Sequence, residues 1–283
     1  WAVTGTTDII STDDSLSALE PGDYTLTVTD LNGCTDVDNF EITEPDPIVI
    51  TEIISDNSGY GVTCNGYSDA SILTDSGNDA NVVGGTGVYT YAWTVTGTTD
   101  IISTEQNLID IAAGLYTLTV TDQNGCTEIE NYEITEPDNP IAINAVESDE
   151  NGWSMSCFGD QDGFINTEPT GGAGGYTYEW IITGTTDIIS TEQNLTAMGP
   201  GDYTLTVTDA NGCEINEDFE ITEPPVLELT LLPSDENGYG ITCFEANNGS
   251  INTNVLGGNG SYTYAWAVTG TTDIISTDDS LSA

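Results

Sequence analysis

Carboxylates and thiols are the side chains from which catalytic or metal chemistry would have to come in this sequence. The chain holds 48 Asp and Glu and six Cys, but no Lys, Arg or His. Without His or Lys there is no Ser–His or Cys–His pair and no Schiff-base nucleophile. Paired carboxylates could hydrolyse glycosidic bonds, yet in a chain of which 17% is acidic such pairs arise by chance. We therefore expect a protein that is not an enzyme.

Calcium is the metal that such a chain could bind, because Ca²⁺ prefers oxygen ligands. Polar clusters at residues 149–151, 160–163 and 235–237 offer such oxygens, and none matches the twelve-residue EF-hand loop. We expect no firm metal site. Asp160 and Asp162 are the candidate ligands for calcium, and diffuse condensation of cations on the carboxylates is the alternative.

The net charge of −48 limits the partners. Like-charge repulsion disfavours nucleic acid and anionic membrane surfaces, and the repulsion within the chain must be relieved by salt or cations. No apolar run reaches the roughly 18 residues of a membrane span, so we expect no membrane insertion. The 13 Tyr and five Trp, placed at strand-like positions, argue against the disorder that such acidity would otherwise indicate.

The six cysteines form two sets, which are Cys34, Cys126 and Cys213 after a turn, and Cys64, Cys157 and Cys243 near the start of a repeat. Two per repeat, without Cys-x-x-Cys, favour disulfides in an oxidising compartment over metal ligation. If the second strand of a sandwich starts where the sixth ends, Cys64–Cys126 and Cys157–Cys213 form within modules and contribute about 4 kcal/mol each. Cys34 and Cys243 then have partners outside the sequence shown. The alternative, Cys34–Cys64 with Cys126–Cys157, would join neighbouring modules.

A strand and a turn position the second half of each repeat. Residues 116–126 recur almost unchanged at 24–34 and 203–213. Tyr116, Leu118 and Val120 alternate with threonines, which predicts a half-buried strand. The Asp-x-Asn-Gly that follows predicts a tight turn, since Asn and Gly tolerate positive φ.

The spacing of these elements predicts tandem modules of about ninety residues. Trp1, Trp93, Trp180 and Trp266 are successively 92, 87 and 86 residues apart, and the first eighteen residues are identical to the last eighteen. We expect a window from a longer polymer, in which Glu-Pro linkers separate the modules. The expected parts are a C-terminal half module at 1–45, complete modules at 46–137 and 138–224, and the N-terminal part of a module at 225–283.

Two recurring segments could serve as interaction surfaces. The aromatic strand Tyr-x-Tyr-x-Trp could be a sugar platform, but a central strand of a sandwich favours core packing. The segment Thr-Gly-Thr-Thr-Asp-Ile-Ile-Ser-Thr is unchanged in four copies. It is either a shared turn with a buried Ile pair, or a repeating contact between modules or chains through Ile9, Ile10, Ile101, Ile102, Ile188 and Ile189.

Short motifs also suggest sugar attachment. Asn194, Asn248 and Asn259 stand in N-glycosylation sequons, and Ser15 and Ser280 stand in the Asp-Ser-aliphatic context of bacterial O-glycosylation. Unmodified surface turns are the alternative at each of these five positions.

The assembled motif resembles the SprB-type repeat of giant surface adhesins in gliding Bacteroidota. It runs from Cys-Phe-Gly-x-x-Asp-Gly-x-Ile at 157–165, through the aromatic strand, to the turn and cysteine at 201–213. Residues 65–67 and 244–246 depart from the Cys-Phe-Gly step. The resemblance implies an immunoglobulin-like sandwich, export to the cell surface, and adhesion or filament building.

We therefore expect an all-β protein of tandem immunoglobulin-like β-sandwich modules in an extended array. Its expected function is that of a structural and adhesive repeat segment in a long extracellular fibre, stalk or filament, whose partners are neighbouring modules or chains. The alternatives are a carbohydrate-binding adhesin module, with surface glycans as partners, and a non-covalent filament subunit completed by strand exchange.

Overall fold

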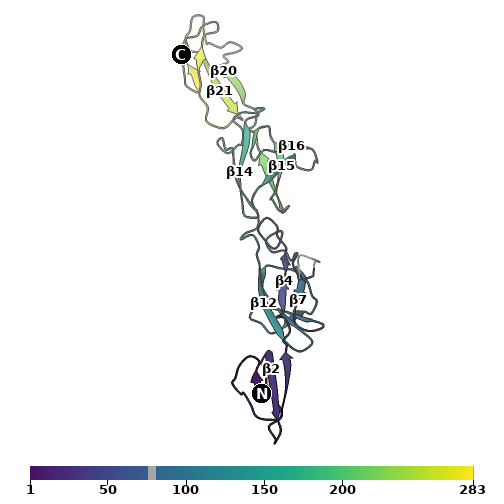
Figure 1. Ribbon diagram of the computed structural model, residues 1–283. Helices are drawn as coiled ribbons and strands as arrows, with labels where there is room; N and C mark the ends of the chain where they lie inside the picture. The colour runs from purple at the N-terminus through teal and green to yellow at the C-terminus, as the bar shows by residue number, and fades with distance from the viewer. Residues whose placement is uncertain (76–80, 283) are drawn as a thin grey trace. The chain divides into compact units, whose positions relative to one another are not determined.

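All regular structure in the described residues is β-strand (Figure 1). The computed structural model describes residues 1–75 and 81–282, so that residues 76–80 and Ala283, which ends the last expected module, lie outside the description. Within those ranges no helix is long and apolar enough to cross a membrane. The all-β expectation is confirmed. The chain divides into two compact units, residues 1–56 with 67–135 and residues 57–66 with 136–283.

Residues 138–224 fold as a sandwich of seven antiparallel strands. One sheet has the order β13-β14-β17 and the other the order β16-β15-β18-β19. The strands are β13 (Ala142–Glu147), β14 (Gly163–Thr170), β15 (Thr177–Ile182), β16 (Ile188–Ser190), β17 (Leu195–Met198), β18 (Gly201–Thr208) and β19 (Glu214–Ile221).

The core of this sandwich is built by the alternation that the sequence shows. Along β18, Tyr203, Leu205 and Val207 are buried, while the threonines between them are half-buried. They pack in one cluster with Trp180, which is fully buried, and with Phe219. The Tyr203 hydroxyl donates to the carbonyl of Gly199 at 3.0 Å, as in the tyrosine corner of immunoglobulin-like sandwiches. The sandwich interpretation and the core role of the tryptophan are confirmed.

Residues 46–137 carry an equivalent four-stranded sheet, but their other strands form two smaller sheets in place of one. The sheets have the orders β12-β11-β8-β9, β10-β6-β5 and β4-β7. The strands are β4 (Val49–Thr51), β5 (Ile53–Ile54), β6 (Ala70–Leu73), β7 (Asn81–Val83), β8 (Thr90–Val95), β9 (Ile101–Ser103), β10 (Leu108–Ile111), β11 (Gly114–Thr121) and β12 (Thr127–Ile134). Trp93 is fully buried and contacts Tyr132, as Trp180 contacts Phe219.

The two remaining parts of the chain hold fewer strands. Residues 1–45 carry β1 (Ala2–Val3), β2 (Gly22–Thr29) and β3 (Thr35–Ile42). Residues 225–283 carry β20 (Glu228–Pro233), β21 (Ser250–Leu256), β22 (Trp266–Ala267), β23 (Ile274–Ser276) and β24 (Ser280–Ser282). Phe40 on β3 is 65% exposed, whereas Tyr132 and Phe219, at the same place in the repeat, are buried. The apolar face of β3 therefore lacks the covering sheet that the longer parts have.

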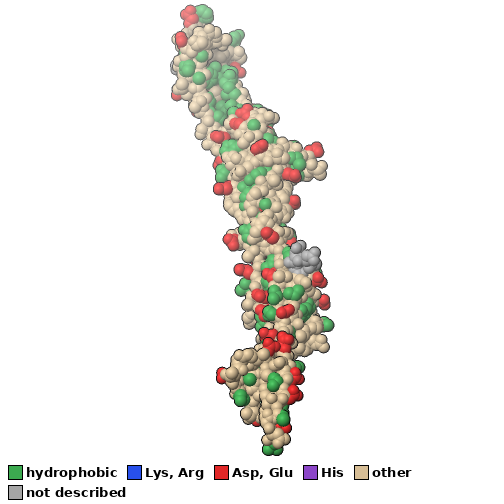
Figure 2. All heavy atoms as spheres, in the orientation of Figure 1, with side chains coloured by type: hydrophobic (Ala, Val, Ile, Leu, Met, Phe, Trp, Pro, Cys, Tyr) green, Lys and Arg blue, Asp and Glu red, His purple; other side chains and the backbone are tan. Residues whose placement is uncertain are grey.

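Apart from the buried Asp122 and Asp209, the acidic side chains of the described residues lie at or near the surface. Figure 2 shows them distributed along the visible face, with no basic side chain among them. Because no cation within the protein neutralises this charge except the N-terminal ammonium, salt and counter-ions must screen it.

Candidate functional site

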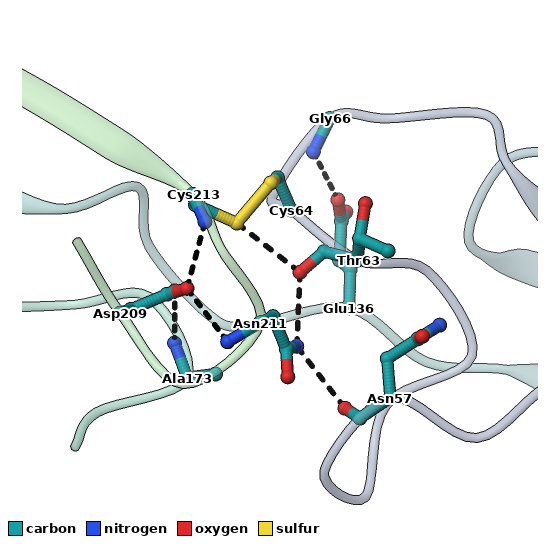
Figure 3. The surroundings of a disulfide bond; sticks show 9 residues. All are labelled: Asn57, Thr63, Cys64, Gly66, Glu136, Ala173, Asp209, Asn211 and Cys213. Carbon is teal, nitrogen blue, oxygen red and sulfur yellow. Dashed lines mark hydrogen bonds between the residues drawn. A yellow bond between two sulfur atoms is a disulfide. The ribbon is translucent and has the colours of Figure 1, made fainter.

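A disulfide joins Cys64 to Cys213, with their Cα atoms 5.8 Å apart (Figure 3). Cys64 comes from the repeat at 46–137 and Cys213 from the repeat at 138–224, but the loop 57–66 belongs to the same compact unit as residues 136–283. The expected pairs Cys64–Cys126 and Cys157–Cys213 are therefore wrong. The alternative pairs are wrong as well, because Cys34, Cys126, Cys157 and Cys243 are unpaired and exposed.

The position of the Cys157 loop on its own sandwich is the first part of the explanation for why Cys157 and Cys213 do not bond. The backbone N–H of Gly159 donates to Oε2 of Glu223 at 2.9 Å. Glu223 lies two residues beyond the end of β19, so the Cys157 loop lies at the end of the sandwich where the last strand finishes.

Cys213 lies at the other end. Asp209, which precedes it in the turn after β18, accepts a 2.8 Å hydrogen bond from the N–H of Ala173, in the loop after β14. The Cys157 loop precedes β14 and this turn lies beyond it. The eight residues of β14 separate the two by roughly 26 Å at about 3.3 Å per residue. A disulfide requires Cα atoms about 4.4–6.8 Å apart, so the bond within this module cannot form.

A strand count gives this result from sequence alone. Three strands, β15, β16 and β17, separate β14 from β18, and their pairings are antiparallel. Each connection reverses the chain, so β14 and β18 run in the same direction. The start of one and the end of the other are then at opposite ends of the sandwich. The sequence argument counted the strands correctly, as second and sixth, but wrongly placed the start of one and the end of the other at the same end, although four reversals leave the two strands running in the same direction.

The path of the chain explains why Cys64 meets the following repeat and not the preceding one. Asn65 donates through Nδ2 to the carbonyl of Pro137 at 2.7 Å, and the N–H of Gly66 donates to Oε2 of Glu136 at 2.6 Å (Figure 3). Glu136 and Pro137 are the linker into residues 138–224. The Cys64 loop therefore lies where the next repeat begins.

The turn that presents Cys213 is held rigid by one carboxylate. Oδ1 of Asp209 accepts hydrogen bonds from the N–H groups of Asn211 and Cys213, both at 2.9 Å. Oδ2 reaches the Gly-rich loop 171–175, where Gly172 is required because a Cβ atom there would lie 2.5 Å from that oxygen. A buried carboxylate that accepts several backbone N–H groups fixes its surroundings strongly.

The turn also binds the loop 57–66 without the sulfur bridge. Asn211 donates through Nδ2 to the carbonyl of Thr63 at 3.0 Å and to that of Asn57 at 3.1 Å. The Cys213 sulfur lies 3.3 Å from the Thr63 oxygen, a contact only, since a disulfide sulfur carries no proton. Sequence reasoning missed Asn211, although the Asn of Asp-x-Asn-Gly recurs at Asn32 and Asn124.

The same turn exists in the repeat at 46–137, without a partner for its cysteine. Oδ1 of Asp122 accepts from the N–H groups of Asn124 and Cys126, at 2.9 and 2.8 Å. Its Oδ2 accepts from the N–H and hydroxyl of Thr86. Desolvation raises the pKa of the Asp122 carboxyl, but these hydrogen bonds outweigh it, and the pKa is lowered overall.

The expected buried Ile pair is wrong. Ile101 and Ile102 are 58% and 47% exposed, and Ile9, Ile10, Ile188 and Ile189 are exposed as well. The strands β9 and β16 that carry two of these pairs are at the edges of their sheets. The segment closes instead around the tryptophan, because the indole N–H of Trp93 donates to the carbonyl of Glu105, twelve residues on. Trp1, Trp180 and Trp266 make the same hydrogen bond.

Asp160 and Asp162, the candidate calcium ligands, converge on one hydroxyl. Ser156 Oγ lies 3.0 Å from Oδ2 of Asp160 and 2.5 Å from Oδ2 of Asp162. The hydrogen bond from the Ser156 hydroxyl lowers the pKa of Asp162. Across residues 1–75 and 81–282, no group of three or more Asp, Glu, Cys or His lies close enough to hold a metal ion.

The candidate glycosylation residues have different surroundings. Ser15 and Asn194 are exposed, and Ser280 lies in β24. Asn248 donates through Nδ2 to the Thr242 hydroxyl, and Asn259 donates through Nδ2 to the carbonyl of Ser156 at 2.7 Å. A glycan on Asn259 would displace that contact.

Comparison with known proteins identifies one family model. Residues 154–185 and 241–268 match the SprB repeat, which agrees with the resemblance seen in the sequence. No curated protein matches the chain. Among solved structures, the chain is similar to a crystal structure of the N-terminal eight Ig domains of Down Syndrome Cell Adhesion Molecule, isoform 1.30.30. That likeness has 14% identity and a TM-score of 0.28, and covers 83% of this chain and 34% of that chain. This chain thus spans about a third of that chain's length.

Proposed function

We propose that this chain is a structural and adhesive repeat segment of a long extracellular surface protein, built into a fibre, stalk or filament. The SprB repeat matches support this proposal. The observation that carries it is the disulfide between two consecutive repeats. Disulfides persist in oxidising surroundings outside the cytosol, which favours a surface or shed location.

The disulfide gives the linker between these repeats a second covalent path. The bonded cysteines are 149 residues apart, and Glu136 and Pro137 lie between them. A force applied to the chain ends passes through the sulfur atoms and leaves these 149 residues unloaded. A chain with this connection suits a mechanical role, and it contributes no catalytic group.

Neighbouring copies of the chain or its modules are the partners that this function requires. The exposed Ile pairs on the edge strands β9 and β16 are the proposed contacts. Because every copy carries the same acidic charge, such contacts need salt or cations to screen the repulsion. Calcium at Asp160 and Asp162 is part of the proposal only as one of these screening cations.

Single-molecule stretching of the full chain tests the mechanical part. Between ends held at residues 1 and 283, the oxidised chain is expected to extend by roughly 500 Å less than the reduced chain, since 149 residues at about 3.5 Å each stay closed. The variant with Cys64→Ala and Cys213→Ala should extend like the reduced chain. Equal extension of oxidised and reduced chains would contradict the mechanical role.

Labelling of intact cells tests the surface location. Antibodies against the folded chain should bind unpermeabilised cells or shed filaments, and mass spectrometry of the denatured native material should give its covalent length. Labelling that appears only after permeabilisation would contradict the extracellular assignment.

A further inference from the structure

We propose that the Cys64–Cys213 bond is one link in a series of equivalent disulfides, and that Cys157 forms the next one. Its partner is the cysteine of an Asp-x-Asn-Gly-Cys turn in the repeat that begins at residue 225. The rule is that the loop cysteine of one repeat bonds to the turn cysteine of the next repeat along the chain. This inference does not depend on the cellular location proposed above.

The first support is that the Cys157 loop already contacts the following repeat. Ser156 precedes Cys157 as Thr63 precedes Cys64, and the carbonyls of both accept a hydrogen bond from the following repeat, which for Thr63 comes from Asn211 of the turn and for Ser156 from the Gly-rich loop. For Ser156 the donor is Nδ2 of Asn259, at 2.7 Å. Cys157 therefore lies against residues 225–283 as Cys64 lies against residues 138–224.

The second support is an open groove beside Cys157. Phe158, Leu227, Asn259 and Tyr262 line it together with Cys157, and Phe158 is 55% exposed. Oδ1 of Asn259 is buried with no hydrogen-bond partner among the described residues. A buried acceptor without a donor is costly, so a segment that brings a donor to this groove would be stabilised there.

The third support is the place of Asn259 in the repeat. It corresponds to Ala173, whose N–H binds Asp209 of the turn that carries Cys213. The loop around Asn259 is thus the place where a turn of this kind docks. A turn docked there would lie in the groove beside Cys157.

The turn needs no rearrangement to act as the partner. Oδ1 of Asp30 accepts from the N–H groups of Asn32 and Cys34 at 2.9 and 2.8 Å, although Cys34 is unpaired. The same geometry recurs at Asp122, whose Cys126 is unpaired, and at Asp209, whose Cys213 is bonded, so the turn has the same form with and without the bond. Pre-organisation of this kind favours bond formation.

Bond formation requires an oxidant, which we take to be a small-molecule disulfide such as oxidised glutathione. The Cys157 thiolate attacks this disulfide and releases one glutathione thiolate, which leaves Cys157 in a mixed disulfide. The turn cysteine then attacks the Cys157 sulfur and releases the second. Two protein thiols lose two protons and two electrons in total, and one oxidised glutathione becomes two reduced molecules.

The test uses the identity of the first eighteen and last eighteen residues. Adding a second copy of residues 19–45 after residue 283 completes the last repeat with the chain's own sequence, including a second copy of Cys34. The extended chain is folded with a glutathione redox pair, its free thiols are blocked, and it is digested without reduction by a protease that cuts at Glu and Asp. Mass spectrometry then identifies the bonded peptides.

We expect two bonded pairs, Cys64 with Cys213 and Cys157 with the added copy of Cys34. Blocked thiols should be found at the original Cys34, Cys126 and Cys243. In the Cys157→Ala variant, the added copy should be blocked and the Cys64–Cys213 bond unchanged. A bond from the added copy to Cys243, or a blocked added copy while Cys64–Cys213 forms, would overturn the rule.

Discussion

Removal of the Cys64–Cys213 bond should destabilise the second compact unit far more than removal of any other two thiols. The bond closes a loop of 149 residues. The loop-entropy relation gives about 5 kcal/mol for a loop of that size, more than the roughly 4 kcal/mol of a bond within one module. At about 2–4 °C per kcal/mol for a chain of this size, the midpoint of thermal unfolding should fall by about 10–20 °C.

The measurement is urea unfolding of the double variant Cys64→Ala with Cys213→Ala. Urea is preferred to guanidinium because guanidinium is a salt and would also screen the −48 charge. The matched control is Cys126→Ala with Cys157→Ala, which removes two exposed, unpaired thiols and should leave the free energy of unfolding unchanged within about 0.5 kcal/mol. A loss below about 1 kcal/mol in the first variant, or equal losses in both, would refute the reasoning.

Three further predictions follow from single side chains and from the charge. Burial raises the pKa of Tyr132, whose hydroxyl is buried without a partner among the described residues, so Tyr132→Phe should leave stability unchanged or raise it by about 1 kcal/mol. Tyr116→Phe, which removes a hydrogen bond to the carbonyl of Ala112, should cost about 1 kcal/mol, and urea unfolding compares the two. Because the folded-state pKa of Asp122 is lowered, the stability lost in Asp122→Asn should be constant above pH 3.8 and should shrink as the pH falls below it. A difference that grows on acidification would contradict this sign. Thermal unfolding midpoints should rise with NaCl, and CaCl₂ and MgCl₂ at equal ionic strength should raise them equally if cations only condense. A clear excess for Ca²⁺ would show a specific site and contradict diffuse condensation.

The sequence predicted the strands and their buried faces because both depend on local pattern. The period of two along residues 116–121 fixes which side chains face the core, and Asp-x-Asn-Gly fixes the turn. The same local logic placed Trp93 and Trp180 in the core. These features need no knowledge of how the strands are arranged in three dimensions.

The disulfide was not predicted because it depends on topology. Whether Cys157 and Cys213 lie at one end of the sandwich depends on the number of chain reversals between β14 and β18. The sequence argument had these as the second and sixth strands, but it did not draw the consequence that four reversals leave them parallel in direction. The prediction of a buried Ile pair was wrong for a related reason. Its β-branched residues favour a strand, but only the sheet order shows that β9 and β16 are edges without a covering layer.

The non-reducing peptide map of the unaltered chain tests the central claim most directly. After blocking of free thiols and digestion at Glu and Asp, the peptide with Cys64 should be recovered bonded to the peptide with Cys213, with Cys34, Cys126, Cys157 and Cys243 blocked. Recovery of Cys64 bonded to Cys126, or of Cys157 bonded to Cys213, would contradict the claim that the disulfide joins consecutive repeats.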